Sequence, residues 1–471
     1  MIATSALTAP TQCEFDRELI EKLDGYGPRY TSYPTADRFH GGFTAADYQH
    51  WLAQRTIGAS TKPLSLYVHL PFCNTVCYYC ACNKVITKDR SKADTYLHYL
   101  QKELALHAAG LGEGQHEVVQ LHFGGGTPTF LSDSQMTRLM DSIREHFTLA
   151  AGGEFSIEID PRKVTAETVR LLASVGFNRM SVGVQDFEPA VQAAVNRIQT
   201  EEETRLVIDT ARAAGFKSVS VDLIYGLPLQ TVDSVMRTVD KVLAMRPDRL
   251  AIYNYAHLPT MFMPQRRIIE ADLPSAEVKL DILQSVVQRL AAEGYVFIGM
   301  DHFALPTDDL AIALKQGRLQ RNFQGYSTHA DHDLVAVGVS AIGKIGPSYS
   351  QNVKTLDEYY AALDDNHIPI LRGMVLNADD ILRRNLIQRL MCQFALSMQA
   401  IEEVHSIEFA SYFAEELADL ARYAEAGMLT IDQEWITVTP KGRFLIRTIA
   451  MVFDRYLREK RQTSARYSKV I

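Results

Sequence analysis

Four of the six cysteines lie within ten residues of one another, as Cys73, Cys77, Cys80 and Cys82. Thiolates that follow one another so closely on a loop are typical of iron–sulfur clusters. The first three have the spacing C-x3-C-x2-C, which supplies three ligands and leaves one iron of a 4Fe–4S cluster without a protein ligand. An open coordination position is what a catalytic metal centre needs and a structural centre lacks. The spacing therefore predicts a catalytic 4Fe–4S cluster on this loop.

A structural zinc site is the alternative for these cysteines. Such sites normally take two pairs of ligands from separated segments, which lets the chain wrap around the metal. The other two cysteines, Cys13 and Cys392, stand alone, so the cluster is the better interpretation. Cys82 is not assigned as a ligand, because a fourth thiolate would close the open iron. It is either a thiol that faces the site or a small buried residue.

The elements that must position this loop form a repeating pattern of strand and helix. Apolar, β-branched runs alternate with segments of helical periodicity, which predicts a parallel sheet with helical crossovers. The predicted strands are 64–70, 118–123, 155–159, 179–184, 218–224 and 250–255. The predicted helices between them are 92–109, 134–146, 165–173, 203–214 and 232–245.

Polar or glycine-rich residues end nearly every one of these strands, as in the segment 124–127 and at Glu158, Gln185 and Asp222. In a barrel the carboxyl ends of all strands converge on one mouth, whereas an open sheet uses mainly one switch point. The distribution favours an α/β fold built on an incomplete parallel (β/α)6 TIM-like barrel. The cysteine loop, which directly follows the first strand, is then at the mouth.

The alternation ends after a predicted helix at 278–291 and a strand at 295–303. Further along, helical patterns at 379–394 and 401–420, a hairpin at 428–438 and a last helix at 441–460 predict a smaller, mostly helical C-terminal domain.

Length and charge exclude several classes of protein. The 471 residues allow two domains, and the net charge of −8 gives no reason to expect a nucleic-acid partner. The N-terminal residues show no basic stretch followed by an apolar core, and no apolar run approaches the roughly 20 residues of a membrane-spanning helix. We expect a cytoplasmic monomer with no secretory signal and no membrane span.

The spacing of the cysteines, with the aromatic Tyr79 before the third, is the signature of the radical S-adenosylmethionine (SAM) superfamily. Within it, the chain resembles the oxygen-independent coproporphyrinogen III oxidases from about residue 20 to its C-terminus. The matching segments include GPRYTSYP at 27–34, YVHLPFC at 67–73, HFGGGTPT at 122–129, GVQDF at 183–187, DLIYGLP at 222–228 and NFQGY at 322–326.

The resemblance implies a 4Fe–4S cluster and one or two molecules of SAM as cofactors. Cys73, Cys77 and Cys80 would ligate the cluster. The residues implied around the first SAM are Tyr67, Tyr79 near the adenine, Gly125, whose backbone approaches the methionine end, and Glu158 as the acidic contact. The residues implied for a second pocket are Gly126, Thr127, Gln185, Arg197, Asp222, Ala256 and Ile342. Its occupant is either a second SAM or an anionic arm of the substrate.

The reaction implied is the oxidative decarboxylation of two propionates of coproporphyrinogen III to vinyl groups, giving protoporphyrinogen IX in haem biosynthesis. A 5′-deoxyadenosyl radical would take a hydrogen from the propionate β-carbon, and an electron donor and an electron acceptor of unknown identity are needed. The substrate carries four carboxylates, so cationic partners are expected. Arg29 and Cys82 are the candidates on the substrate side, and Arg266 and Arg267 are weaker ones.

The resemblance also divides the chain. Residues 1–55 would be an N-terminal extension that reaches the active site, 56–305 the radical SAM barrel, 306–372 a barrel-associated segment on the substrate side, and 373–471 the helical C-terminal domain. One segment departs from close relatives, because Gly343 and Lys344 stand where a less flexible, uncharged stretch is expected.

A haem chaperone is the main alternative, since such relatives share the barrel and the three cysteines but hand on haem without oxidising coproporphyrinogen. They typically lack the fourth cysteine and the long N-terminal segment, and this chain has both. A radical SAM methyltransferase or a haem-degrading relative is a second alternative. The matches at 322–326 and 299–303 argue against it.

Overall fold

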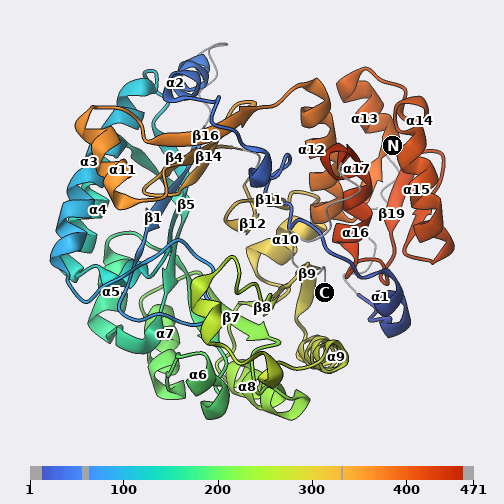
Figure 1. The fold of residues 1–471 in the computed structure, drawn as a ribbon, viewed down its shortest axis with the longest axis horizontal. Coiled ribbons are helices and arrows are strands. Elements are labelled where there is room, and N and C mark those ends of the chain that lie inside the picture. The colour runs from blue at the N-terminus through green and yellow to red at the C-terminus, as the bar shows by residue number, and fades with distance from the viewer. Residues whose placement is uncertain (1–12, 56–62, 330–331, 460–471) are drawn as a thin grey trace.

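The computed structural model describes residues 13–55, 63–329 and 332–459 (Figure 1). Its largest part is a sheet of twelve strands with helices packed on its outer face. The six predicted strands are all present and parallel. They are β1 (Leu64–Leu70), β4 (Glu117–Gly125), β5 (Thr148–Ile159), β6 (Arg179–Gln185), β7 (Ser218–Tyr225) and β8 (Arg249–Asn254).

The helices that connect these strands are α3 (Ser91–Gly110), α4 (Asp133–His146), α5 (Ala166–Ser174), α6 (Pro189–Ala194), α7 (Glu201–Ala213) and α8 (Val232–Ala244). Four of them, α4, α5, α7 and α8, begin at a side-chain cap. Ser132, Thr200 and Thr231 each form a capping box with the residue three positions later.

The parallel sheet continues beyond residue 305. β13 (Asp333–Val337) pairs in parallel with β1, and β14 (Ile342–Ile345), β15 (Ser348–Asn352) and β16 (Ile370–Val375) follow as antiparallel strands, with α11 (Leu356–Asp364) between the last two. β13 comes after a hairpin of β11 (Gln320–Asn322) and β12 (Gly325–Ser327), not after a crossover helix, so the strand–helix pattern did not reveal it.

At the other edge, the predicted single strand at 295–303 is wrong. After α9 (Ala276–Ala292), the chain forms β9 (Val296–Gly299) and β10 (His302–Ala304), which pair with each other antiparallel. Gly299 and Met300 have positive φ angles of 150° and 51°, so the backbone turns there instead of remaining extended. In the described part of the chain β9 does not pair with β16, so the barrel is incomplete, as predicted.

Gly343 and Lys344 also differ from the expectation of a flexible stretch. Both lie within β14, and Lys344 is buried. Paired strand residues lose their backbone freedom whatever their local preference. The departure in sequence therefore falls in a regular strand of the sheet.

The C-terminal domain is mostly helical, as predicted, and α12 (Ala378–Gln393) agrees with the predicted helix at 379–394, but two other predicted helices are interrupted. The range 401–420 is not one helix, because Ser406 is left-handed (φ 53°) and ends the first of three. The range 441–460 is also interrupted, because Asp454 is extended and its carboxylate accepts from the backbone N–H groups of Tyr456 and Leu457. The elements after α12 are β17 (Ala395–Ser397), α13 (Met398–His405), α14 (Phe409–Tyr412), α15 (Ala414–Glu425), β18 (Leu429–Ile431), β19 (Trp435–Val438), α16 (Ile446–Ala450) and α17 (Arg455–Glu459).

The N-terminal segment joins the two parts. Figure 1 shows it in blue, with α1 (Arg17–Leu23) beside the C-terminal domain and α2 (Ala45–Gln54) on the far side of the molecule, near β14 and β16. The Lys441 Nζ atom lies 3.0 Å from the Asp16 carboxylate, and His40 forms a β-bridge with Gly373. Tyr30 donates to the Asp454 carboxylate at 3.0 Å.

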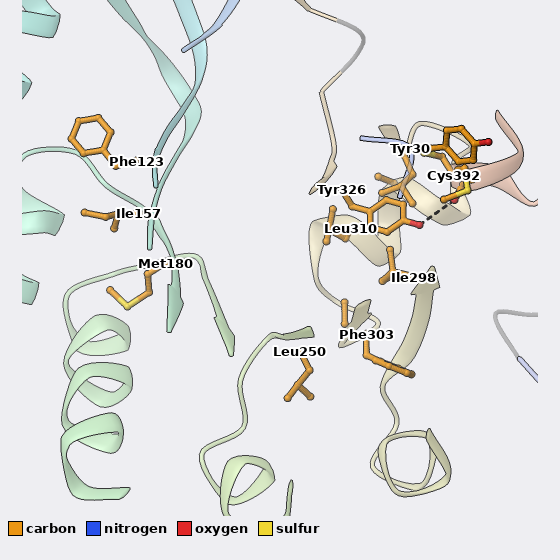
Figure 2. Packing of buried hydrophobic residues seen from close by; sticks show 14 of the residues in the cluster. Tyr30, Phe123, Ile157, Met180, Leu250, Ile298, Phe303, Leu310, Tyr326 and Cys392 are labelled. Atoms are coloured by element: carbon orange, nitrogen blue, oxygen red, sulfur yellow. Dashed lines mark hydrogen bonds between the residues drawn. The ribbon is translucent and has the colours of Figure 1, made fainter. Parts of the chain in front are cut away.

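One hydrophobic core runs through both parts. Figure 2 shows Phe123, Ile157 and Met180 on β4, β5 and β6, and Tyr326 and Cys392 near the C-terminal domain. The Tyr326 hydroxyl donates to the Met391 carbonyl at 3.1 Å, so β12 is held against α12. Among the residues described, none of the helices combines the length and apolar character needed to span a bilayer.

Candidate active site

The cysteine loop follows β1 and is anchored along its length. Cys73 belongs to the short strand β2 (Phe72–Cys73), which pairs with β3 (Val85–Ile86). The Tyr78 N–H donates to the Val195 carbonyl at 2.9 Å, and the Asn196 side-chain amide donates to the Val76 carbonyl at 2.8 Å. These bonds tie the loop to the end of α6.

Two further side chains hold the second half of the loop. The Lys84 ammonium donates to the carbonyls of Cys80 and Cys82 at 3.1 and 3.2 Å, and the Gln265 amide donates to the Tyr79 carbonyl at 3.0 Å. Each of these bonds satisfies a loop carbonyl that has no partner in regular secondary structure. Hydrogen bonds from neighbouring protein groups therefore hold the loop in place.

The loop forms one wall of a cavity of about 470 Å³ at the carboxyl ends of the parallel strands. The opposite walls come from the ends of β4 to β7, as a barrel mouth requires. The cavity brings together most of the residues predicted from the sequence. They are Cys73, Cys77, Tyr79, Cys80, Cys82, Gly125, Gly126, Thr127, Glu158, Gln185, Arg197 and Asp222.

Four predicted residues do not line this cavity. Tyr67 lies on β1 with its ring stacked on His122, at a centroid distance of 5.8 Å. Ala256 follows β8, and Ile342 on β14 packs against Phe39 and its neighbours. Arg29 forms an ion pair elsewhere, with Asp301.

The two weaker candidates also lie outside the cavity, in the loop after β8. Arg266 and Arg267 are both exposed. The Arg266 Nε group donates to the Pro259 carbonyl at 3.0 Å, and the Arg267 guanidinium lies over the Tyr78 ring at 5.2 Å.

The thiols differ in their electrostatic surroundings. Burial raises the pKa of Cys73 to about 11. A hydrogen bond from Cys82, and then the charge of Lys84, lower the pKa of Cys80 to about 6 against the effect of burial. The same hydrogen bond raises the pKa of Cys82. The arrangement favours a thiolate at Cys80 and a neutral thiol at Cys82.

Cys77 is the sulfur that receives cationic donors. The guanidinium groups of Arg162 and Arg197 lie 3.7 and 3.6 Å from its Sγ atom. Asp160 lies between the two arginines and contacts both, at 2.6 and 3.3 Å. Sequence reasoning missed Arg162 and the role of Asp160; the one available signal was an ionisable residue just past the end of β5.

The three thiols fit an iron–sulfur cluster better than a zinc ion. Within the described ranges, no group of three or more His, Cys, Asp or Glu side chains converges on one metal position. A 4Fe–4S cluster does not require such convergence, because each thiolate binds a different iron atom. A thiolate favoured at Cys80 and cationic donors to Cys77 are features that a thiolate-bound cluster uses.

The glycines at the end of β4 and just after it leave room beside the loop. A Cβ atom on Gly126 would lie 2.5 Å from the Pro71 carbonyl oxygen, and one on Gly125 would lie 2.6 Å from the His69 ring. Gly125 also has a φ of +116°, which side chains other than glycine rarely adopt. The Gly126 N–H donates to the Leu70 carbonyl at 2.9 Å, so this turn is held directly against the end of β1.

Two carboxylates, Glu158 on β5 and Asp222 on β7, have opposite character. Glu158 keeps 45% of its side-chain surface accessible to the cavity, and its Oε2 atom accepts from the Gly125 N–H at 3.2 Å. Burial opposes its ionisation, but His122 and this bond lower the pKa of Glu158 overall. Burial raises the pKa of Asp222 to about 7, although Ser181 donates to it at 2.9 Å. The surroundings therefore favour the ionised form of Glu158 and leave Asp222 partly protonated near neutral pH.

Comparisons with known proteins agree with this geometry. A model of the radical SAM superfamily matches residues 67–242, and a model of the HemN C-terminal domain matches residues 376–445. The oxygen-independent coproporphyrinogen III oxidase of Pseudomonas aeruginosa is 52% identical over 459 residues, which cover 97% of this chain and 99% of that protein. The Escherichia coli protein of the same name is 49% identical over 98% of this chain and 99% of its own length.

A solved structure has the same fold over nearly the whole chain. It is coproporphyrinogen III oxidase (HemN) from Escherichia coli, described as a radical SAM enzyme, with a TM-score of 0.90 and 47% identity. The match covers 95% of this chain and 100% of that one. The cysteine loop at the mouth of an incomplete barrel, the C-terminal domain and the identities all agree, and this chain belongs to the oxygen-independent coproporphyrinogen III oxidase family of radical SAM enzymes.

Proposed function

We propose that this chain converts coproporphyrinogen III to protoporphyrinogen IX by oxidative decarboxylation of two propionates, without oxygen. The observation that carries the proposal is one cavity that combines Cys73, Cys77 and Cys80 with Glu158 and Arg197. It occurs in a chain that is 52% identical, over 97% of its length, to a protein named for this reaction.

Three residues would hold the cluster, and others would hold SAM beside it. Cys73, Cys77 and Cys80 supply the thiolates, and Gly125 lets the backbone approach the methionine end of SAM. Glu158, whose ionised form is favoured, would accept hydrogen bonds from the cationic cofactor. When bound, the cluster and SAM supply a 5′-deoxyadenosyl radical, and the protein's task is to orient the substrate and exclude competing reactions.

The residues implied for the second pocket differ in chemistry from those around the first SAM. Arg197 offers a guanidinium and donates to the Gly183 carbonyl at 2.6 Å, and Gln185 and Asp222 lie in the same wall. A carboxylate matches the fork geometry of a guanidinium, so Arg197 would bind the carboxylate of a second SAM or of a substrate propionate. Competition between the two ligands in a binding experiment would distinguish these occupants.

Cys82 and Arg29 would act on the substrate side. Cys82 is exposed and held as a neutral thiol, so it would contact substrate without ligating the cluster. Arg29, from the N-terminal extension, would bind a propionate. The proposal also divides the chain into residues 1–55, 56–305, 306–372 and 373–471. It describes a cytoplasmic monomer that works with an electron donor and an electron acceptor.

The test is an anaerobic assay of the reconstituted protein with dithionite, SAM and coproporphyrinogen III, following protoporphyrin and 5′-deoxyadenosine together. The proposal requires both products and their loss in Cys73→Ala, with Cys13→Ser, outside the cavity, as the matched control. Deoxyadenosine without protoporphyrin would move the substrate elsewhere. Stoichiometric haem binding with neither product would make the chain a haem chaperone.

A further inference from the structure

A group of arginines from three distant segments meets around the N-terminal segment. The Arg321 Nε group, on β11, donates to the Arg29 carbonyl at 3.3 Å. The Arg447 Nε group, on α16, donates to the Pro28 carbonyl at 3.1 Å and its Nη2 group contacts the Gly27 carbonyl. Three positive charges therefore lie along residues 27–29, and none of these arginines lines the cavity of the cysteine loop.

The charge of Arg321 is not balanced by a carboxylate. Arg29 has Asp301 as its ion-pair partner, but no ion pair joins Arg321 to any residue in the described ranges. Arg321 is only 7% exposed, and its Nη1 atom is buried with no hydrogen-bond partner. A buried guanidinium is normally paired with an anion, because removing its charge from water is costly. An anion that binds in the working enzyme would complete the site.

Aromatic rings connect the two arginines. The His302 ring meets Tyr253 and Tyr326 edge-on, at centroid distances of 5.9 and 5.3 Å. The Arg29 guanidinium lies 5.5 Å from the centre of the Tyr253 ring, and that of Arg321 lies 4.7 Å from the centre of the Tyr326 ring. We call these five residues the arginine–aromatic wall. It presents two cations at the ends of a row of rings.

The wall is next to the cavity of the cysteine loop. Tyr253 on β8 pairs with Ile224 on β7, two residues beyond Asp222, which lines that cavity. Burial, and then the nearby Asp222 carboxylate, raise the pKa of Tyr253. Burial, together with Arg321 and Arg29, lowers the pKa of His302 well below its usual value. His302 is therefore neutral and adds no third charge to the wall.

We propose that the arginine–aromatic wall binds the substrate, with Arg321 and Arg29 pairing with two propionate carboxylates and the rings packing against pyrrole groups. Arg447 is a positioning residue that holds the backbone of residues 27 and 28. The proposal rests on the proposed function, since it takes a tetrapyrrole with carboxylate arms as the ligand. It assigns Arg321 as the anchor whose charge the folded protein leaves unpaired.

The test measures equilibrium binding of coproporphyrin III, the stable oxidised form of the substrate, to the reconstituted holoenzyme by fluorescence. Arg321→Gln should weaken binding at least tenfold, and Arg321→Lys should weaken it less, because the charge remains while the fork geometry is lost. Arg318→Gln, an exposed arginine just before the same strand, is the matched control and should bind like wild type. Binding of SAM and the cluster absorbance should be unchanged in all three variants.

A second probe keeps the test valid if Arg321→Gln does not fold. The tetramethyl ester of coproporphyrin III has the same ring without carboxylates, so wild type should bind it at least tenfold more weakly than the acid. The proposal is overturned if the acid and the ester bind equally, or if folded Arg321→Gln binds the acid like wild type. In both cases the proposed function stands as long as wild type still forms protoporphyrin. Absence of protoporphyrin and of porphyrin binding by wild type would overturn both.

Discussion

The cavity of the cysteine loop and the arginine–aromatic wall are built in different ways. The cavity is formed by the ends of consecutive strands, each followed by its own short polar motif. The wall combines residues 29, 253, 302, 321 and 326, and the ion pair between Arg29 and Asp301 spans 272 positions of the chain. A site at the mouth of a barrel can therefore be recognised from local motifs. A site on its open side depends on how distant segments pack.

Replacement of the loop cysteines should have the largest effect on the cavity. Cys73→Ala, Cys77→Ala and Cys80→Ala should each abolish the cluster, because three thiolates are the smallest set that holds it. Cys82→Ser should keep it. The measurement is iron and sulfide content with visible absorbance after reconstitution. A Cys82→Ser protein without a cluster would show that the fourth thiol is a ligand after all.

The stability of the contact between the N-terminal segment and the C-terminal domain should depend on pH through Asp454. Its carboxylate accepts a hydrogen bond from the Tyr30 hydroxyl, next to Arg29 of the wall. Burial raises the pKa of Asp454 to about 6 in the folded protein, above its ordinary value of 3.8. A raised pKa means that the carboxyl stabilises the fold while protonated. This contribution is complete below about pH 4 and is lost as the pH rises through about 6.

The corresponding measurement compares urea unfolding of wild type and Asp454→Asn from pH 4 to pH 7. As the pH rises, the unfolding free energy of wild type should fall relative to that of Asp454→Asn by at most about 3 kcal/mol. The variant removes this titration and keeps an acceptor for Tyr30. A pH-independent difference would contradict the assignment to Asp454.

Gly126→Ala tests whether the turn after β4 must pack directly against the backbone at Pro71. The added Cβ atom would lie 2.5 Å from a backbone oxygen of Pro71, and backbone cannot move away as a side chain can. We expect a loss of about 1–3 kcal/mol in stability, seen as a lower Tm, together with weaker SAM binding. Gly41→Ala is the control, since nothing lies within 4 Å of its added atom. Equal Tm values for the two variants would show that the turn relaxes freely.

Arg162→Gln should have the smallest effect. It removes one of the two guanidinium groups near Cys77 and leaves Asp160 with Arg197 alone. Partners around metal ligands are typically worth about 10–100-fold in affinity, and we expect the lower end because Arg197 remains. The measurement is the rate of cluster loss to a chelator, compared with Arg170→Gln, an exposed arginine on α5 that lies outside the cavity. Equal rates would limit the role of Arg162 to holding Asp160.

The parts predicted well from sequence are those with a strong local period. The six parallel strands and the helices between them follow from apolar runs that alternate with segments of helical periodicity. The prediction failed where one residue changes the backbone direction. Met300 divides a strand, Ser406 ends a helix early, and Asp454 interrupts the last helix, and none of these residue types is itself a reliable breaker.

The sequence by itself determined the chemistry of the cysteine loop, because ligand spacing is a property of neighbouring residues and the strand before them sets the place of the loop. It also marked Gly125, Gly126 and Glu158 as residues at strand ends. Only the tertiary structure decided that Arg162 and Arg197 meet at Cys77, that β13 extends the sheet, and that Arg321 lies unpaired beside Arg29. The physical reason is that contacts between distant segments are selected by burial and charge over the whole fold, and local periodicity carries no record of them.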